Sequence, residues 1–327
     1  MKINKEKEKD FYSKYFYFSY SSLNKLLFSP SLFYKDYILQ NREIRTDKHL
    51  IEGKLIHCLL FEPENLKDKF NIVPQKTPSD NVRKVLKDMT LYTDSETLEK
   101  CDDSVILDSL KSLNLYQSLK TDAQRIAKIK TEANEPYWEF LSNNLVVDVI
   151  DEDTLTRCKE QVEILKANKE VAELFNNDST DFELDSRTKH CEKYLKCKLN
   201  TYDFGLHGYI DYYMVDDENK TITICDLKTT SKTISDFAET IEYYNYWLQA
   251  AIYSKLVYEN ENSDYTILFK FVVIDKYNQV YVFDVTEGTM AKWAEGLNYF
   301  ILEAANHHYT ERNFTLPYEF LKEKVKL

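Results

Sequence analysis

Hydrophobic and polar residues alternate along two neighbouring stretches in the second half of the chain, residues 208–215 and 221–228. The polar run DDENK separates them, so the pattern predicts two strands joined by a turn. Because side chains alternate along a strand, Asp226 and Lys228 share one face of the second strand, about 6.5 Å apart at their Cα atoms. Asp211 lies in the middle of the first strand, among aromatic residues, and can reach across to Asp226.

The other patterns predict helices on both sides of this hairpin and a second hairpin after it. Apolar residues at helical spacing, with capping residues and prolines at the ends, predict helices over residues 16–40 with a break at 29–30, 49–62, 79–89, 95–134, 153–176, 235–258 with a bend near 243–246, and 290–307. Alternating patterns predict further strands over residues 182–204, 265–274 and 280–286. We therefore expect one elaborated α/β domain.

Composition narrows the classes of protein that the chain can belong to. Its 327 residues are 43% hydrophobic, enough for a sizeable core, and its net charge of −12 opposes a general attraction to nucleic acid. A polyanionic partner would therefore need a local basic surface or a metal ion. The six cysteines show no CxxC spacing, which favours reduced thiols and a cytoplasmic location. No apolar run reaches about 18 residues, so we expect neither a membrane span nor a secretion signal.

The first hairpin carries the candidate chemistry. Asp211, Asp226 and Lys228 would place two carboxylates and an ammonium group at one end of the paired strands. Oxygen ligands of this kind bind hard divalent cations such as Mg²⁺. The hairpin therefore predicts a cation site.

Two helices offer further candidates, each with a plainer alternative. Gly53 and His57 are one turn apart on an apolar helix, where a lone histidine usually serves the core, although a glycine one turn away favours a ligand role. Gln249 and Tyr253 are also one turn apart, and they could form only the polar edge of an amphipathic helix. Near the C-terminus, the pair at 307–308 is expected to be a surface pair rather than a metal site.

Basic residues are densest just before the hairpin, along the predicted strand 182–204. On an acidic protein, this stretch is the natural place for a phosphate backbone to bind. Its members, which we predict to contact DNA if the partner is a nucleic acid, are Arg187, Lys189, Lys193, Lys196 and Lys198.

Taken in order, these motifs resemble those of the PD-(D/E)xK nuclease superfamily and, within it, the RecB-like branch. The chain places GxxxH on a helix, Asp on a strand, DxK on the next strand and QxxxY on a following helix. The resemblance extends over about residues 18–290 to phage and prophage exodeoxyribonuclease VIII-type (RecE-like) enzymes. The matching segments are SYSSL at 19–23, Ser29-Pro30, Tyr34, GYID at 208–211, DLKTT at 226–230 and YWLQAAIY at 246–253.

The resemblance implies a restriction-endonuclease-like core, in which a mixed central sheet is flanked by helices, with additional N-terminal helices and a helical insertion. The expected boundaries are a flexible charged tail over residues 1–15, one nuclease domain over 16–310 and a C-terminal tail over 311–327. Within the domain, the insertion would cover 64–181 and the catalytic sheet core 182–286.

The resemblance also implies roles for individual residues. His57, Asp211, Asp226 and the carbonyl of Leu227 would bind Mg²⁺ or Mn²⁺, and Lys228 would act on the attacking water. Gln249 and Tyr253 would position the DNA or Lys228. Some relatives carry one more acidic residue upstream, for which Glu183 and Glu192 are both candidates.

One departure from the resemblance concerns a second cofactor. Relatives with an iron–sulfur cluster have a cysteine before the proline of the N-terminal element and three more near the C-terminus. Here Ser29 precedes Pro30, and no cysteine follows Cys225. We therefore expect no iron–sulfur cluster.

The implied activity is hydrolysis of linear double-stranded DNA in the 5′→3′ direction, which leaves a 3′ single strand for recombination. A single-strand annealing recombinase as partner, a ring-like homo-oligomer and a bacterial host cytoplasm would fit this activity. The alternatives are an endonuclease, a single-strand-specific nuclease, a catalytically inactive DNA-binding protein on the same fold, or a helical interaction protein in which the motifs arose by chance.

Overall fold

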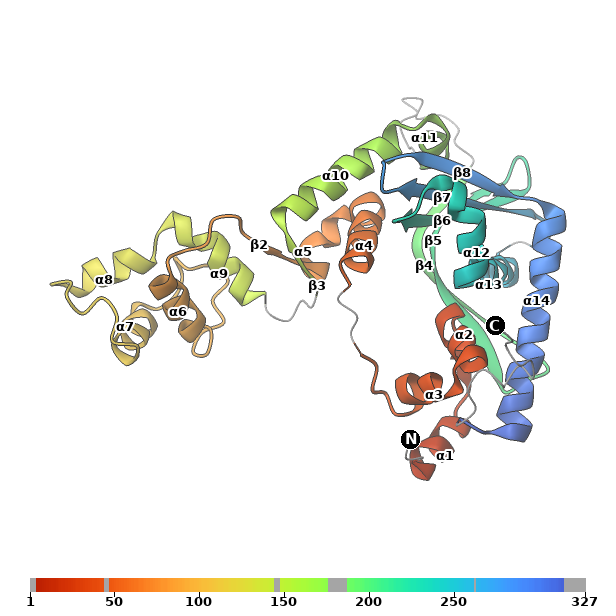
Figure 1. The fold of residues 1–327 in the computed structure, drawn as a ribbon, viewed down its shortest axis with the longest axis horizontal. Helices are drawn as coiled ribbons and strands as arrows, with labels where there is room; N and C mark the ends of the chain where they lie inside the picture. The colour runs from red at the N-terminus through yellow and green to blue at the C-terminus, as the bar shows by residue number, and fades with distance from the viewer. Residues whose placement is uncertain (1–3, 44–46, 144–147, 176–186, 262, 315–327) are drawn as a thin grey trace. The chain divides into compact units, whose positions relative to one another are not determined.

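The computed structural model describes residues 4–43, 47–143, 148–175, 187–261 and 263–314 (Figure 1). By its internal contacts the chain divides into two compact units. Unit 1 consists of Met1–Arg45 and Glu163–Leu327, and unit 2 of Thr46–Val162. Unit 2 begins before the predicted insertion and includes the helix that carries His57. This division does not test the single domain predicted over residues 16–310, which stays a prediction.

Unit 1 is built around a six-stranded mixed sheet with flanking helices, which confirms the predicted fold class. The strand order is β1-β5-β6-β7-β8, and β4 pairs with the other edge of β5. The pairs β1/β5 and β6/β7 are parallel, whereas β4/β5, β5/β6 and β7/β8 are antiparallel. The strands are β1 (Phe16–Phe18), β4 (Arg187–Lys198), β5 (Phe204–Asp216), β6 (Thr221–Thr230), β7 (Thr266–Asp275) and β8 (Val280–Val285).

Strand β5 has two different partners on the edge that β4 does not occupy. Its C-terminal end, Tyr212–Asp216, pairs with β6, and its N-terminal end, Phe204–Leu206, pairs with β1. Residues 207–211 lie between these two ladders. Asp211 is therefore the residue at which β6 stops pairing with β5.

The alternation of β5 also shifts at this point. Ile210 and Tyr213 both belong to the hydrophobic core, although they are three positions apart and regular alternation would put them on opposite faces. On β4, Glu192 lies between the partners of Ile210 and Tyr212 and has a positive φ of 46°, which is unusual for a residue other than glycine. Irregularities of this kind re-aim side chains and occur often beside functional sites.

Helices of unit 1 cover the sheet (Figure 1). Helix α13 packs against β4, β5, β6 and β7, and α14 packs against α13 and α2. The predicted bend is real, because Asn245 adopts a left-handed conformation with φ 56° between α12 and α13. The helical segments are α1 (Lys5–Tyr12), α2 (Tyr20–Phe28), α3 (Pro30–Phe33), the π-helices η1 (Tyr34–Ile38) and η5 (His307–Glu311), α11 (Lys169–Phe175), the 3₁₀-helix η4 (Ile234–Asp236), α12 (Phe237–Tyr244), α13 (Tyr246–Asn260) and α14 (Glu287–Asn306).

The N-terminal region differs from its prediction. Residues predicted as part of a flexible tail form α1, which Asn4 caps and whose Phe11 and Tyr12 pack on the core. The next helix is capped by Ser19, and the stretch before it pairs with β5 as β1 rather than joining the predicted helix. The predicted C-terminal tail lies mostly outside the described residues.

The histidine pair at 307–308 was predicted to lie on the surface, and this prediction is wrong. His307 and His308 are only 2% and 5% exposed. The ring of His307 packs against Phe314, and that of His308 against Phe204. Burial lowers the pKa of His307 to about 4 and lowers that of His308 as well. The rings that contact His308, those of Tyr12 and Phe204, come from distant parts of the chain, which local sequence does not reveal.

Unit 2 is mainly helical and contains a short parallel pair of strands, β2 and β3, that the sequence pattern did not predict. The predicted helix 95–134 is interrupted by left-handed residues at Asn114 and Tyr116. The predicted helix 153–176 breaks at Asn168, whose side chain accepts a hydrogen bond from the N–H of Val171 in the first turn of the next helix, α11. The elements are α4 (Lys48–Phe61), the 3₁₀-helices η2 (Pro63–Asn65) and η3 (Glu132–Asn134), α5 (Leu66–Lys69), β2 (Phe70–Val73), α6 (Asp80–Met89), α7 (Asp103–Ser112), α8 (Asp122–Ile129), α9 (Glu135–Ser142), β3 (Asp148–Asp151) and α10 (Glu152–Ala167), which ends in unit 1. None of the described helices has both the length and the apolar character needed to cross a membrane.

A glycine lets β1 and β4 approach β5 closely. A Cβ atom on Gly205 would lie 2.3 Å from the carbonyl oxygen of Cys197 and 2.8 Å from the ring of Tyr17. We expect Gly205→Ala to lower the free energy of unfolding by at least about 2 kcal/mol, because a backbone atom must move. Urea denaturation followed by circular dichroism measures this change.

The matched control is Gly288→Ala, since a Cβ atom there meets nothing within 4 Å. Gly288 lies in the first turn of α14, where alanine should be neutral or stabilise the helix by up to about 1 kcal/mol. Equal stability of the two variants would contradict the close packing of β1, β4 and β5.

Candidate active site

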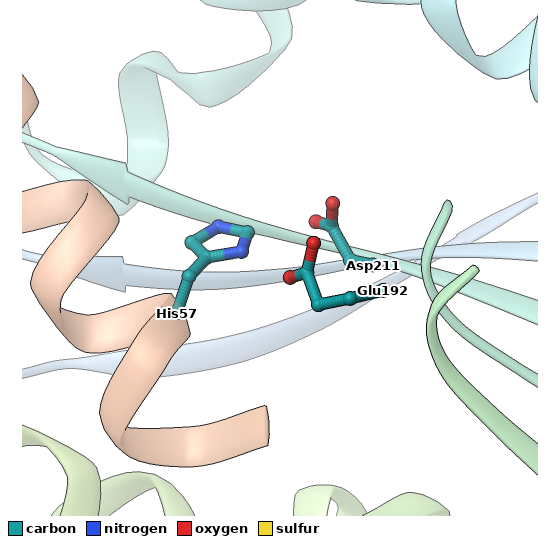
Figure 2. A group of neighbouring side chains, drawn as sticks. All are labelled: His57, Glu192 and Asp211. Atoms are coloured by element: carbon teal, nitrogen blue, oxygen red, sulfur yellow. The ribbon is translucent and has the colours of Figure 1, made fainter. Parts of the chain in front are cut away.

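Two carboxylates lie next to each other at the irregularity in β4 and β5. Glu192 on β4 and Asp211 on β5 offer oxygen atoms within 4.8 Å of one another (Figure 2). Asp211 is 9% exposed, and its Oδ2 accepts a hydrogen bond of 2.9 Å from the backbone N–H of Leu227 on β6. This contact fixes the Asp211 carboxylate where β5 and β6 separate.

A buried ion pair lies on β6 beside them. Asp226 is 0% exposed, and its Oδ2 lies 2.5 Å from Nζ of Lys228, whose side chain is 14% exposed. Burial alone would lower the pKa of Lys228, but the negative charges of Asp226 and Asp211 outweigh it and raise this pKa. The lysine therefore stays charged, and because both side chains leave β6 on the same face, the pair is held in one geometry.

Helix α13 supports the lysine from the other side. Nζ of Lys228 donates a 2.9 Å hydrogen bond to Oε1 of Gln249, and Nε2 of Gln249 donates one of 2.9 Å to the hydroxyl of Tyr253. The ring of Tyr246 lies 4.5 Å from Nζ of Lys228, a cation–π distance. Burial, together with the charges of Asp211 and Asp226, raises the pKa of Tyr253 well above its usual value, so its hydroxyl stays protonated.

A glycine allows this helix to approach the sheet. A Cβ atom on Gly208 of β5 would lie 2.9 Å from the Tyr253 ring and 3.3 Å from Leu256. The absence of a side chain at Gly208 thus lets α13 bring Gln249 and Tyr253 close to the carboxylates.

The donor set fits a hard divalent cation. Glu192, Asp211 and Asp226 are acidic side chains on three neighbouring strands of one sheet, and carboxylate oxygens are the ligands that Mg²⁺ and Mn²⁺ prefer. A cation would offset the repulsion between Glu192 and Asp211, whose oxygen atoms lie within 4.8 Å of one another.

The family profile of the PD-(D/E)XK nuclease superfamily matches residues 17–312 of the sequence. The chain belongs to the PD-(D/E)XK nuclease superfamily. A search of the curated proteins finds no match. Among solved structures, the chain is similar to that of a "Putative exonuclease" from Eubacterium rectale, at 10% sequence identity and a TM-score of 0.48, over 95% of this chain and 88% of that one.

The cluster contains the pattern of residues for which the superfamily is named. The superfamily is named for an acidic residue followed, on the next strand, by an acidic residue, any residue and a lysine. In this member of the PD-(D/E)XK superfamily, Asp211 and the Asp226-Leu227-Lys228 run occupy this arrangement on β5 and β6. The coarser assignment, a nuclease of this superfamily with a candidate site for a divalent metal, follows from membership together with the donor set.

Several predicted residues of this superfamily member stay predictions. His57, also labelled in Figure 2, is half-buried on α4 of unit 2. Its role as a metal ligand stays a prediction. The Leu227 carbonyl likewise keeps only its predicted role. Glu192 lies beside Asp211, whereas Glu183, the other acidic candidate, falls outside the described residues. The five predicted DNA-binding residues all lie on β4.

Sequence reasoning did not assign a role to Tyr246, although its ring contacts the ammonium group of Lys228. The signal was present in the sequence, since Tyr246 precedes Gln249 by three residues on the same face of one helix. Glu192 could not be chosen over Glu183 from spacing, because the register between β4 and β5 is set by pairing between distant residues.

Proposed function

We propose that this PD-(D/E)XK superfamily member is a RecB-like, exodeoxyribonuclease VIII-type exonuclease that degrades linear double-stranded DNA from 5′ ends and leaves 3′ single strands. The observation that supports it most is the convergence of Asp211, Asp226 and Lys228 at the point where β5 and β6 separate. The exonuclease mode and the 5′→3′ direction rest on the resemblance in sequence motifs. The implied partners are a single-strand annealing recombinase and further copies of this chain in a ring.

Each residue has a defined task in this proposal. Glu192, Asp211 and Asp226, with His57 and the Leu227 carbonyl, would hold Mg²⁺ or Mn²⁺. When bound, the cation supplies a Lewis acid that polarises the scissile phosphate and stabilises developing negative charge.

Lys228, as an ammonium group, would orient the attacking water and offset negative charge on the phosphate. Gln249 and Tyr246 keep its ammonium group in place, because they contact it from α13 while Asp226 contacts it from β6. A cation-loaded site together with the basic residues of β4 would allow a protein with a net charge of −12 to bind DNA.

The experiment compares linear and covalently closed circular duplexes of the same sequence in Mg²⁺. We expect the linear duplex to be degraded and the closed circle to stay intact, because an exonuclease needs an end. Phosphorothioate linkages at both 5′ ends should slow degradation strongly, whereas the same linkages at the 3′ ends should not.

Nicking of the closed circle would instead identify an endonuclease. Protection by 3′ linkages alone would reverse the proposed direction. If neither duplex is cleaved although the protein binds Mn²⁺, the chain is a single-strand-specific nuclease or a DNA-binding member of the superfamily without catalytic activity.

A further inference from the structure

A row of tyrosines and lysines lies on one face of β4, β5 and β1. We call it the tyrosine–lysine strip. The register pairs Tyr194 with Tyr209 and Lys196 with His207, and it places both Lys198 and Tyr17 beside Gly205. Because side chains alternate, all these residues share one face. The strip consists of Tyr15, Tyr17, Tyr194, Lys196, Lys198 and Tyr209.

The rings of the strip form two contacting pairs, and three of the four tyrosines are exposed. Tyr209 is 59% exposed and Tyr194 43% exposed, and their ring centroids are 5.0 Å apart. At the other end, the rings of Tyr15 and Tyr17 are 4.9 Å apart. Exposed tyrosines that stand next to each other on a sheet bury little area, so core packing does not account for them.

The lysines are interleaved with these rings. Nζ of Lys196 lies 5.6 Å from the centroid of the Tyr17 ring, and Nζ of Lys198 lies 5.9 Å from that of Tyr15. The opposite face of the same strands is core, since Leu195, Cys197 and Leu206 belong to the main hydrophobic cluster. The strip is thus the polar and aromatic outer face of a well-packed part of the sheet.

This combination fits single-stranded DNA better than a duplex. Aromatic side chains stack on unpaired bases, and lysines between them bind the phosphates. In a duplex the base faces are already stacked on one another, so exposed tyrosine rings would gain nothing from it. The positive charge of the strip complements the DNA backbone on a chain that is otherwise acidic.

On both strands the strip ends two residues away from the candidate active site. Tyr194 follows Glu192 by two residues on β4, and Tyr209 precedes Asp211 by two residues on β5. From Glu192 to Lys198 the strand spans about 20 Å, at roughly 3.3 Å per residue. A strand bound along the strip would therefore end close to the position in the sheet where β4 and β5 carry the carboxylates and where their alternation shifts.

We infer that the tyrosine–lysine strip binds single-stranded DNA, with bases stacked on Tyr194 and Tyr209 and phosphates bound by Lys196 and Lys198. This inference rests on the proposed nuclease function and specifies which form of DNA contacts the sheet beside the carboxylates. It assigns the strip to the single strand that enters or leaves the site.

The test measures binding of a fluorescein-labelled oligo(dT) and of a blunt-ended hairpin duplex by anisotropy, with the full chain in EDTA so that cleavage does not occur. We expect Tyr194→Ala/Tyr209→Ala to weaken oligo(dT) binding about tenfold or more, because each stacked base contributes substantially. Binding of the duplex should change less than about twofold. Thermal unfolding of each variant checks that it is folded.

Two further variants separate stacking from other effects. Tyr194→Phe/Tyr209→Phe keeps the rings and should bind oligo(dT) as the wild type does. The matched control is Tyr281→Ala/Tyr299→Ala, which removes tyrosines of similar exposure, 53% and 50%, from β8 and α14. This control should leave binding unchanged.

The lysines are tested through salt dependence. Lys196→Gln/Lys198→Gln should reduce the slope of log K against log salt for oligo(dT) by about 1.4, since each phosphate contact to a single strand contributes about 0.7. Unchanged oligo(dT) binding in the alanine variant, equal weakening for the duplex, an equal loss in the phenylalanine variant or an unchanged salt slope would overturn the inference. Because the assay needs no cleavage, its failure differs from failure of the nuclease proposal, which the linear and circular duplexes test.

Discussion

Replacement of Lys228 by methionine should lower the rate of DNA hydrolysis by about a hundredfold or more. A positioned group that offsets the charge developing in the transition state contributes about 10²–10³ in rate. Lys228 is the ammonium group held among Asp226, Gln249 and Tyr246, so no other side chain in this cluster supplies its charge. Asp226→Asn should cause a loss of similar size. Initial rates on an end-labelled linear duplex measure both effects.

The control replaces a lysine of similar size that lies outside the cluster. Lys255 on α13 pairs with Glu259 at 3.1 Å and is partly exposed. Lys255→Met should leave the rate within about twofold of the wild type, because an exposed ion pair contributes little. Unchanged activity in both Lys228→Met and Asp226→Asn would sink the assignment of the active site.

Removal of the metal should abolish DNA hydrolysis, and removal of the carboxylates that would bind it should weaken metal binding. EDTA should abolish hydrolysis, and added Mg²⁺ or Mn²⁺ should restore it. Asp211→Asn should weaken Mn²⁺ binding by at least about a hundredfold. Mutation of a residue that only holds a metal ligand in place already lowers metal affinity about 10–100-fold. Glu192→Gln should also weaken it, since its carboxylate lies beside that of Asp211. Calorimetric titration of Mn²⁺ measures the affinities directly.

The matched control is Asp284→Asn, which removes a 73% exposed carboxylate that pairs with Lys270 on β7. This variant should bind Mn²⁺ as the wild type does. His57→Ala tests the predicted histidine ligand. Its control is His190→Ala, because the His190 ring stacks on Tyr213 and is not one of the predicted ligands. Wild-type Mn²⁺ affinity in Asp211→Asn would exclude the carboxylates of β4 and β5 as the metal site.

Local sequence patterns correctly predicted which side chains of β6 and of α13 lie together. The alternation along β6 put Asp226 and Lys228 on one face, and their side chains form the ion pair of the structure. The spacing of Gln249 and Tyr253 put them one turn apart on α13, where they share a hydrogen bond. Both arrangements depend only on residues close together in the chain, for which backbone geometry fixes the direction of each side chain.

Features that join distant residues did not follow from these patterns. The proximity of Glu192 to Asp211 needs the register of β4 on β5. The burial of His308 needs the rings of Tyr12 and Phe204, which lie far from it in the chain. The pairing of β1 with β5, which completes the tyrosine–lysine strip, joins residues that lie far apart in the chain.

The sequence by itself determined that this protein has a mixed α/β fold and a DxK strand followed by a QxxxY helix, because periods of two and of 3.6 residues are properties of the local backbone. Tertiary structure decided where β5 loses its partner, which acidic residue lies beside Asp211 and which tyrosines stay exposed next to the site. These depend on strand register and on the helices that cover each face, and both are fixed by contacts between segments far apart in sequence.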